Sequence, residues 1–326
     1  MKKFKHISDF NPDEDLPLPD DLDWEVADKI LKPQVQERVK KITVPCDKLS
    51  QILFEFSADE YTDILEYRDQ CSCIEVKKGK KAATPFWLEL VEDYADKLPP
   101  DAFTREVLFH AMNFYQRGFN HVTISMALDS LTGGEEKRHV CREQFEAIKA
   151  AIEKLMKTAI KINLRPFFEA FPKYAKNYKG NPDRAELEGT ILPCRLVHVE
   201  VNGQATLAVE MLGESPLMTY AKLKNQLMTY DVTPLAISGQ RNTPTVITVK
   251  NYLLRRIELM KRGLNNSILF KTLYENCSLA NATKKQKQDV RKTVEETLNS
   301  FKADGVIQNF EFERRGNGYR SIKITP

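Results

Sequence analysis

Hydrophobic residues recur with a helical period through residues 282–303, close to the end of the chain. Those on one face of this predicted helix are Val290, Val294, Leu298 and Phe301. Steps of three and four residues place them within about 80° of one another, because each helical residue turns by about 100°. The opposite face is polar. The pattern therefore predicts a long helix that packs one side against a core.

Two shorter patterns flank this helix. Apolar residues within 268–274 predict a short helix before it, and residues 277–281 read as the link. After the helix, residues 306–313 and 319–325 are strand-like and enclose a glycine-rich basic turn. A short helix, a long helix and a two-stranded hairpin follow one another in a winged-helix domain. We therefore interpret residues 266–326 as such a domain.

The middle of the chain predicts a similar plan. Helical spacing follows Thr104, a candidate N-cap, and resumes after Thr123 or Ser125. A longer third helix is predicted at residues 137–158, and a strand at 160–164. The order again suits a winged helix.

The clearest hairpin signal lies further on in the middle of the chain. Asn202 and Gly203 provide the two positive-φ positions of a type I′ turn between strand-like residues 192–201 and 204–211. A strand at 85–91, preceded by a strand at 73–76 and a basic turn at 77–81, completes the pattern in front. Residues 165–189 are interpreted as an insertion of undefined form.

A connecting region separates the two predicted domains. Pro216 begins a predicted helix, and residues 232–237 and 245–249 are rich in β-branched side chains that favour strands. Residues 250–261 then predict a linker helix.

The first residues of the chain differ from the rest. Residues 1–35 combine clustered acids with prolines, a composition that buries little apolar surface. No element is predicted over residues 36–69. We predict an α+β, mainly helical chain with two winged-helix (helix-turn-helix) domains in tandem behind an acidic N-terminal extension that is partly disordered. The predicted domain ranges are 1–79, 80–237 and 238–326.

Charge is distributed unevenly over these ranges. The net charge is −8 over residues 1–101, +2 over 102–237 and +9 over 238–326, which together give the +3 of the whole chain. A strongly basic C-terminal part favours a polyanionic partner. A solvated basic surface is the alternative.

The polar face of helix 282–303 carries the candidate DNA contacts. They are Lys284, Lys285, Gln288 and Lys292, with Arg291 at the flank. Lys, Arg and Gln near the start of a recognition helix can reach base edges and phosphates in the major groove of double-stranded DNA. Lys287 lies beside the apolar stripe and is left out. The hairpin tip adds Arg314, Arg315, Tyr319 and Arg320.

The corresponding helix of the middle domain is less basic. Its candidates are Lys137, Arg138 and Arg142, and acids such as Glu143 and Glu146 lie nearby. Dimerisation or packing explains this helix as well as DNA binding does. Arg255 and Arg256 on the linker helix could contact phosphate or tie the two domains together.

The sequence lacks the common catalytic signatures. It has no phosphate-binding loop of the Walker type and no His-x-His pair, and Cys71-x-Cys73 has no second ligand pair at zinc spacing. His110, within an apolar helix, is interpreted as a core or boundary residue rather than a ligand. We expect no enzyme activity, no cofactor and no metal. The six cysteines are expected to be free thiols in a cytoplasmic protein, because neither a signal peptide nor a membrane span is evident.

Two segments resemble a known family. Residues 104–108 (TREVL), followed by a helix ending at Gly133, are similar to the first winged helix of plasmid and mobile-element replication initiators of the iteron-binding Rep type. Residues 251–257 (NYLLRRI) are similar to the helix that leads into the second winged helix of that family. The resemblance covers roughly residues 80–326.

The resemblance implies a protein that binds repeated origin sites on double-stranded DNA and recruits host replication factors. It also implies that the C-terminal winged helix makes the main base contacts, while the first contributes to a monomer–dimer switch. Two alternatives stay open. One is a winged-helix transcriptional regulator, such as an autorepressor, and the other is a protein-interaction scaffold.

Overall fold

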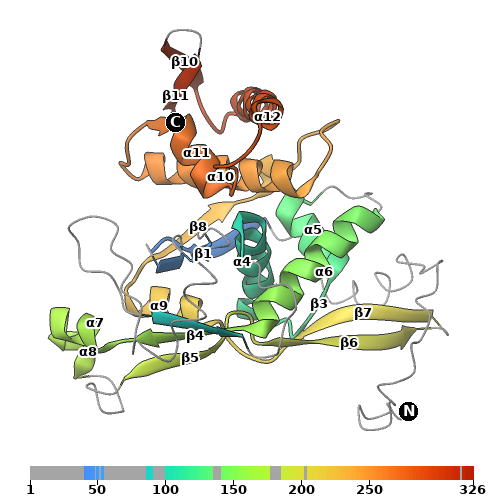
Figure 1. The fold of residues 1–326 in the computed structure, drawn as a ribbon, viewed down its shortest axis with the longest axis vertical. Helices are drawn as coiled ribbons and strands as arrows, with labels where there is room; N and C mark the ends of the chain where they lie inside the picture. The colour runs from blue at the N-terminus through green and yellow to red at the C-terminus, as the bar shows by residue number, and fades with distance from the viewer. Residues whose placement is uncertain are drawn as a thin grey trace.

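The computed structural model is an α+β fold built from helices and short antiparallel sheets (Figure 1). The residues that it describes are 40–47, 49–50, 53–54, 86–90, 100–134, 141–176, 185–201, 204–315 and 318–326. The predictions for residues 1–35, for the strand at 73–76 and for the turn at 77–81 lie outside these ranges.

A first group of elements, called here the middle unit, forms one of the sheets and its helices. Its elements are α4 (Ala102–Gln116), β3 (His121–Thr123), α5 (Ile124–Thr132), α6 (Arg142–Lys157), β6 (Cys194–Val201) and β7 (Gln204–Met211). The strand order is β3-β7-β6, so the strand before α5 pairs with the second strand of the hairpin. The register pairs Val201 with Gln204, which agrees with a two-residue connection at the predicted turn.

A second group, called here the C-terminal unit, has the same order of elements. They are α10 (Pro244–Lys261), β9 (Ser267–Leu269), α11 (Phe270–Asn276), α12 (Lys284–Ala303), β10 (Asn309–Arg315) and β11 (Gly318–Thr325). Its strand order is β9-β11-β10, so again the strand before the second helix pairs with the last strand of the hairpin.

The remaining elements surround the middle unit. A three-stranded sheet has the order β2-β4-β5, and a two-stranded sheet pairs β1 with β8. Their bounds, with those of the short helices between them, are β1 (Lys41–Pro45), β2 (Phe86–Leu90), β4 (Thr158–Asn163), α7 (Arg165–Ala170), α8 (Pro172–Ala175), β5 (Glu186–Thr190), α9 (Pro216–Leu223), β8 (Leu227–Asp231) and the 3₁₀ helix η5 (Thr233–Leu235). Strand β1 lies in a stretch for which the sequence predicted no element.

Capping side chains fix where the helices begin. The Thr123 hydroxyl accepts a hydrogen bond from the Met126 backbone N–H at 3.1 Å and begins α5, as predicted. The predicted N-cap at Thr104 is wrong. Asp101 occupies that position, and its carboxylate accepts from the backbone N–H and the hydroxyl of Thr104 at 2.8 Å each. An aspartate three residues earlier offers a stronger acceptor for the free N–H groups of the first turn.

Helix α10 begins earlier than the sequence pattern indicated. Residues 245–249 were predicted as a strand, but they form the first turns of α10, where Thr243 caps the helix and Pro244 takes its first position. Buried Ile247 and Val249 show that packing overrides the strand preference of β-branched residues here. The strand predicted at 232–237 is absent, because that stretch contains the 3₁₀ helix η5, and Ile268 and Leu269 lie in β9 rather than in a helix.

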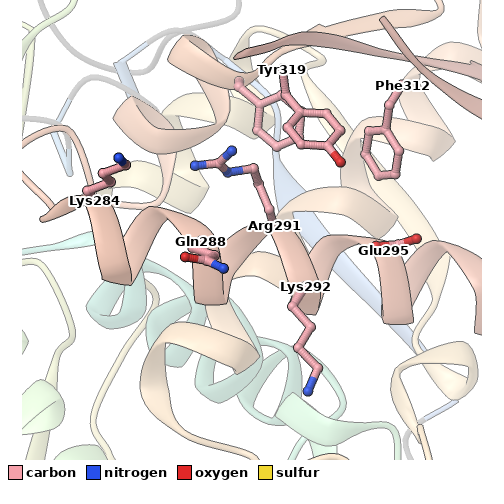
Figure 2. Close-up of a pocket in the computed structure, with 8 residues that line it drawn as sticks. Lys284, Gln288, Arg291, Lys292, Glu295, Phe312 and Tyr319 are labelled. Atoms are coloured by element: carbon pink, nitrogen blue, oxygen red, sulfur yellow. The ribbon is translucent and has the colours of Figure 1, made fainter. Parts of the chain in front are cut away.

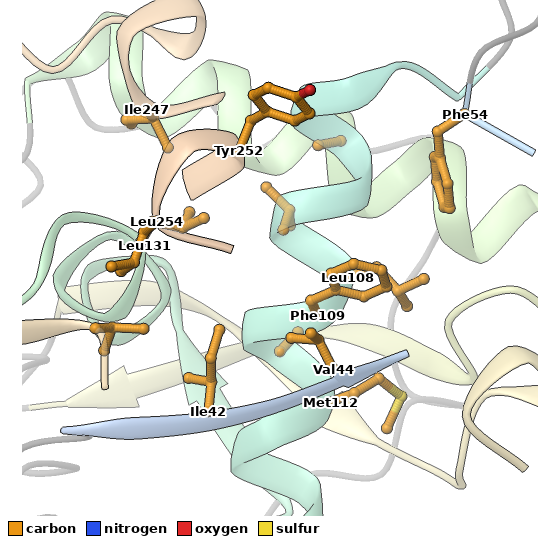
Figure 3. Packing of buried hydrophobic residues seen from close by; sticks show 14 of the residues in the cluster. Ile42, Val44, Phe54, Leu108, Phe109, Met112, Leu131, Ile247, Tyr252 and Leu254 are labelled. Atoms are coloured by element: carbon orange, nitrogen blue, oxygen red, sulfur yellow. The ribbon is translucent and has the colours of Figure 1, made fainter. Parts of the chain in front are cut away.

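One continuous hydrophobic core joins the two units. Helix α10 packs against α4, α5 and η5 in the middle unit and against α11 and α12 in its own unit. Figure 3 shows side chains from α4, α10 and β1 gathered in this cluster, among them Phe109, Tyr252 and Val44, all of them buried. The C-terminal unit is therefore seated on the middle unit through α10 (Figure 1).

Buried charges cross the same junction. Glu106 of α4 accepts two hydrogen bonds from Arg255 of α10, at 2.8 and 3.0 Å, and pairs with Arg105 at 2.9 Å. Arg105 also donates to the Asn276 carbonyl at the end of α11, at 3.1 Å. Burial alone would raise the pKa of the Glu106 carboxyl, but the two guanidinium groups hold it below its ordinary value. The carboxylate therefore stays ionised inside the protein.

His110 belongs to a second buried network at this junction. Asn251 of α10 donates through Nδ2 to the Leu131 carbonyl at 3.0 Å, which leaves its Oδ1 to accept from His110 Nε2 at 3.1 Å. His110 Nδ1 then accepts from the Ser130 hydroxyl at 2.7 Å. Burial lowers the pKa of His110 to about 4, so the ring is neutral at pH 7. The prediction of a core histidine is confirmed.

Candidate nucleic-acid interface

Helix α12 separates its apolar and polar side chains as predicted. Val290, Val294, Leu298 and Phe301 are all buried against the core. The helix begins with a capping box, in which the Thr283 hydroxyl accepts from the Gln286 N–H and the Gln286 side chain accepts from the Thr283 N–H at 2.8 Å. This cap satisfies free N–H groups of the first turn and fixes where the basic residues start.

The opposite side of α12 presents cations and amides to solvent. Lys284, Lys285, Gln288 and Lys292 are exposed. Within the described part of the chain, Lys284, Lys285 and Gln288 have no hydrogen-bond or ion-pair partner. Lys292 lies 3.8 Å from Glu296, one turn further along. An exposed ion pair at that spacing contributes little free energy, so its lysine can exchange partners.

Lys287 lies elsewhere on the helix, in agreement with its exclusion from the candidates. Its ammonium group donates to the Ala280 carbonyl at 3.0 Å and lies 5.5 Å from the centre of the Tyr274 ring. Lys287 therefore fastens the link before α12. Burial raises the pKa of Tyr274, although nearby Arg291 lowers it, so this phenol keeps its proton.

A bulge orients the hairpin toward α12. Arg314 pairs with Tyr319, whereas Glu313 pairs with Ser321, so Arg320 is an extra residue in β11. In a strand without a bulge, the alternation that buries Ile322 and Ile324 would turn the side chain of Arg320 inward as well. The bulge instead gives the inward place to Tyr319 and leaves Arg320 exposed.

The Tyr319 ring connects the hairpin to the helix. The guanidinium of Arg314 lies 4.9 Å from the ring centre and donates to the Tyr319 hydroxyl at 3.1 Å. Arg291 of α12 lies 5.4 Å from the same ring centre. Such cation–π contacts hold an arginine in place without neutralising its charge. Arg315 ends β10 at the hairpin tip.

A groove of about 340 Å³ runs between α12 and this hairpin (Figure 2). We call it the α12 groove. Its helix wall carries the side chains of Lys284, Gln288, Arg291, Lys292 and Glu295. The opposite wall consists of three rings, Phe270, Phe312 and Tyr319, which lie 5.3 to 6.1 Å apart between centres.

The structure thus brings most of the candidates in the C-terminal unit to one surface, and it adds residues that the sequence analysis missed. Phe270 and Phe312 were not singled out. The signal was present in β10, where Phe312 and Arg314 share a face because alternate strand residues point the same way. Phe270 follows β9 directly and gave no such signal.

The candidates of the middle unit are placed differently. Arg142 is exposed and is the first residue of α6, and Lys137 and Arg138 lie outside the described residues. Glu143, in the same turn as Arg142, forms an ion pair at 2.9 Å with Arg241. The start of α6 is therefore of mixed charge, unlike the start of α12.

The two linker arginines are both used within the protein. Arg255 is buried against Glu106, which favours the interpretation that it ties the units together. Arg256 donates to the backbone carbonyl groups of Asn265 and Ser267, at 3.3 and 3.5 Å. Both arginines therefore hold parts of the fold together and do not belong to the polar face of α12.

Metal ligands are not gathered in the described part of the chain. Among those residues, no three His, Cys, Asp or Glu side chains form a set that could hold a metal ion. The described cysteines, Cys46, Cys141, Cys194 and Cys277, are free thiols. Cys71 and Cys73 lie outside the described ranges. No helix in those ranges is long and apolar enough to cross a membrane.

Comparison with known proteins returns only distant structural similarity. No family model and no curated protein matches this sequence. The chain is similar to domains 2 and 3 of RctB, with 11% identity over 79% of this chain and 91% of that chain, and a TM-score of 0.37. A further structure of these domains gives a TM-score of 0.34, also at 11% identity, over 79% and 93% of the two chains.

The Pi initiator protein in complex with iteron DNA is a third similar structure. It has 12% identity, a TM-score of 0.30, and coverage of 88% of this chain and 97% of that chain. TM-scores this low do not establish a shared fold.

Proposed function

We propose that this protein binds double-stranded DNA sequence-specifically, with its two units acting as winged-helix domains in tandem. The observation that supports this most is the exposed Lys and Gln face of α12 beside an arginine-bearing hairpin. The start of α12 enters the major groove, where Gln288 reaches base edges and Lys284 and Lys285 reach bases or phosphates. The hairpin, with Arg314, Arg315 and Arg320, lies along the backbone or in the neighbouring minor groove.

The middle unit has a supporting role in this proposal. The mixed charge at the start of α6 suits packing or self-association better than base reading. The unit therefore contributes to a homodimer and adds weaker DNA contacts through Arg142, together with Lys137 and Arg138.

We further propose that the DNA-binding activity serves replication initiation on a plasmid or mobile element, without enzymatic activity or a cofactor. The support is the resemblance of residues 104–108 and 251–257 to iteron-binding initiators. These two segments contact each other, through Glu106 and Arg255. Repeated origin sites and host replication factors would then be the partners. A transcriptional regulator of the same architecture is the alternative.

Selection from a random duplex library tests DNA recognition directly. The full chain should enrich a defined sequence and bind it more weakly as salt rises, because phosphate contacts release counterions. Replacing Lys284, Lys285 and Gln288 by alanine together should lower affinity for the selected duplex by roughly 100-fold. Replacing Lys302 and Lys323, which lie elsewhere on the same unit, serves as the matched control. Equal affinities of the triple variant and the wild type would refute the assignment of α12.

The arrangement of the selected sequence in the DNA around the gene separates the two roles. An initiator requires several copies in tandem beside the gene, whereas an autorepressor requires a single palindrome within the promoter. Replication of a plasmid that carries the repeats, with the protein supplied in trans, would support the initiator. Repression without replication would favour the regulator.

A further inference from the structure

Two cations face each other at one end of the α12 groove without a counter-ion. Figure 2 shows the ammonium group of Lys284 and the guanidinium group of Arg291 pointing toward one another, with Arg291 next to Tyr319. Among the described residues, neither side chain forms an ion pair with a carboxylate. Like charges in such an arrangement repel, and an anion between them would remove the repulsion.

Arg291 differs from the surrounding lysines because it is already held in place. Its Nε donates to the Lys287 carbonyl at 3.1 Å, and its guanidinium lies over the Tyr319 ring at 5.4 Å. The side chain is half-buried, whereas Lys284 and Lys285 are exposed. A fixed guanidinium loses little conformational entropy on binding and presents a planar set of donors, which suits the oxygens of a phosphate.

The other end of the groove does not favour an anion. Glu295 lies there beside Phe312, and Figure 2 shows Lys292 pointing away from Tyr319. Lys292 is also close to Glu296, at 3.8 Å. The cationic part of the groove is therefore the end that carries Lys284 and Arg291, next to the Tyr319 ring.

The way in which α12 and the hairpin would lie on DNA indicates the ligand of this site. If α12 lies in the major groove and the hairpin reaches the adjacent minor groove, one strand of the duplex must cross between them, because a backbone strand separates the two grooves. This inference rests on the proposed function. We propose that Lys284 and Arg291 hold one phosphodiester of that strand, and that Arg291 is a backbone clamp rather than a base reader.

Tyr319 acts as the positioning residue in this proposal. It contacts Arg291 from the hairpin side, and the bulge at Arg320 is what turns it toward α12. Its hydroxyl is occupied by Arg314. Tyr319→Leu removes the ring and should weaken binding about fivefold without changing the salt dependence, because the cation of Arg291 remains.

A double-mutant cycle between protein and DNA tests the clamp. The probe is the duplex enriched by selection, prepared with one methylphosphonate at a time so that single phosphates lose their charge. Arg291→Ala should lower affinity about tenfold, equally for the selected and a random duplex, and should reduce the magnitude of the salt slope by about one. One methylphosphonate that costs the wild type about tenfold should cost the variant almost nothing.

Gln288→Ala and Lys323→Ala are the matched controls. The first should weaken only the selected duplex, and the second should change neither duplex. Coupling of Arg291 to a 7-deazaguanine substitution instead of a methylphosphonate would overturn the proposal, because a base edge would then be the ligand. Additive effects at every phosphate would overturn it as well.

Two measurements keep this test separate from the proposed function and from folding. Wild-type protein that binds no duplex would refute the proposed function before the clamp is considered. Arg291→Lys retains the charge and should recover part of the affinity with an unchanged melting temperature. If Arg291→Ala lowers affinity only in proportion to a lower folded fraction, the residue serves packing and the clamp is refuted.

Discussion

The third helices of the two units occupy the same place in the order of elements but present different surfaces. Helix α12 begins with exposed Lys284 and Lys285, followed one turn later by Gln288. Helix α6 begins with Arg142 and Glu143, and that acid is paired with Arg241. The two units thus share their strand order but differ in surface charge. The same order of helices and strands can therefore serve different functions, which depend on the side chains at the surface.

The hairpins differ in the same way. In the middle unit, Arg195 of β6 lies opposite Glu210 of β7 and pairs with it at 2.6 Å. In the C-terminal unit, Arg314 of β10 lies opposite Tyr319 and stacks on its ring. A carboxylate neutralises its arginine, whereas a neutral ring fixes the arginine and leaves its charge available. Of these two arrangements, the second keeps a positive charge available to an anionic ligand.

Removing the buried charge that joins the units should have the largest effect. Glu106→Gln leaves Arg105 and Arg255 without their carboxylate, and we expect the free energy of unfolding to fall by about 3–5 kcal/mol. Denaturant titration measures it. Glu143→Gln, which removes an exposed partner of Arg241, should change it by less than about 1 kcal/mol. Similar losses in both variants would show that the junction is not specially stabilised.

Substitutions at two glycines that follow helices allow the packing of the two units to be compared. Gly133 ends α5 with φ of +85°, and a Cβ there would lie 2.5 Å from the Ala236 nitrogen. Gly305 follows α12 with φ of +70° and open space around it. Gly133→Ala should therefore cost about 3 kcal/mol of unfolding free energy, and Gly305→Ala only about 1 kcal/mol. Equal shifts in denaturation midpoint would contradict the close approach of η5 to α5.

Acid should weaken the junction between the units through His110. Its pKa is about 4 in the folded protein and near 6.5 when unfolded, so below pH 6.5 the unfolded state binds more protons. Stability is thus full above pH 6.5 and declines as the pH falls toward 4, by about 2 kcal/mol at pH 5. The lowered pKa of Glu106 acts in the same direction at still lower pH.

Denaturant titrations at pH 7.5 and 5 measure this decline. His110→Gln removes the titrating group, and the variant should show a smaller difference between the two pH values than the wild type. If the variant keeps the full pH dependence of stability, that dependence arises from groups other than His110.

The smallest effect is expected on the surface of the middle unit. Arg142→Ala should change the affinity for the selected duplex by less than about threefold, because nearby acids already offset its charge. Fluorescence anisotropy at about 0.1 M salt, where surface electrostatics are still strong, checks this. A tenfold loss would mean that both units read DNA, and the contrast between α6 and α12 would no longer hold.

The sequence predicted best those elements whose signals are local. The apolar stripe of α12, the polar face opposite it and the two hairpins depend on residues close in the chain. Helix α10 was predicted only from residue 250 onward, because its β-branched first turns are helical through a Thr-Pro cap and burial of Ile247. Strand β1 does alternate, with buried Ile42 and Val44 between Lys41 and Thr43, but it is only five residues long and pairs with the distant β8, so no local turn signal marks it.

The buried contacts between units could not be predicted from sequence. Glu106 and Arg255 are separated by 149 positions, and nothing in either segment shows that the other lies opposite. The α12 groove also arises from segments that are separate in the sequence, since its wall of aromatic rings combines Phe270, Phe312 and Tyr319 from three elements. Its cations were predictable because they share one helix. Its aromatic wall depends on how distant segments pack.

Helix α10 packs against both units, and this determines where the chain could be joined to part of a related protein. A joint before Thr243 would separate Glu106 from Arg255, and an unmatched buried charge is poorly tolerated. A joint at Gly263 would leave that pair intact and disturb mainly the apolar contact of α10 with α12, which accepts changes of similar volume more readily. Gly263 is exposed, with φ of +94° and free space around it. Exchanging the proposed DNA-binding region alone should therefore work best as a transplant of residues 263–326.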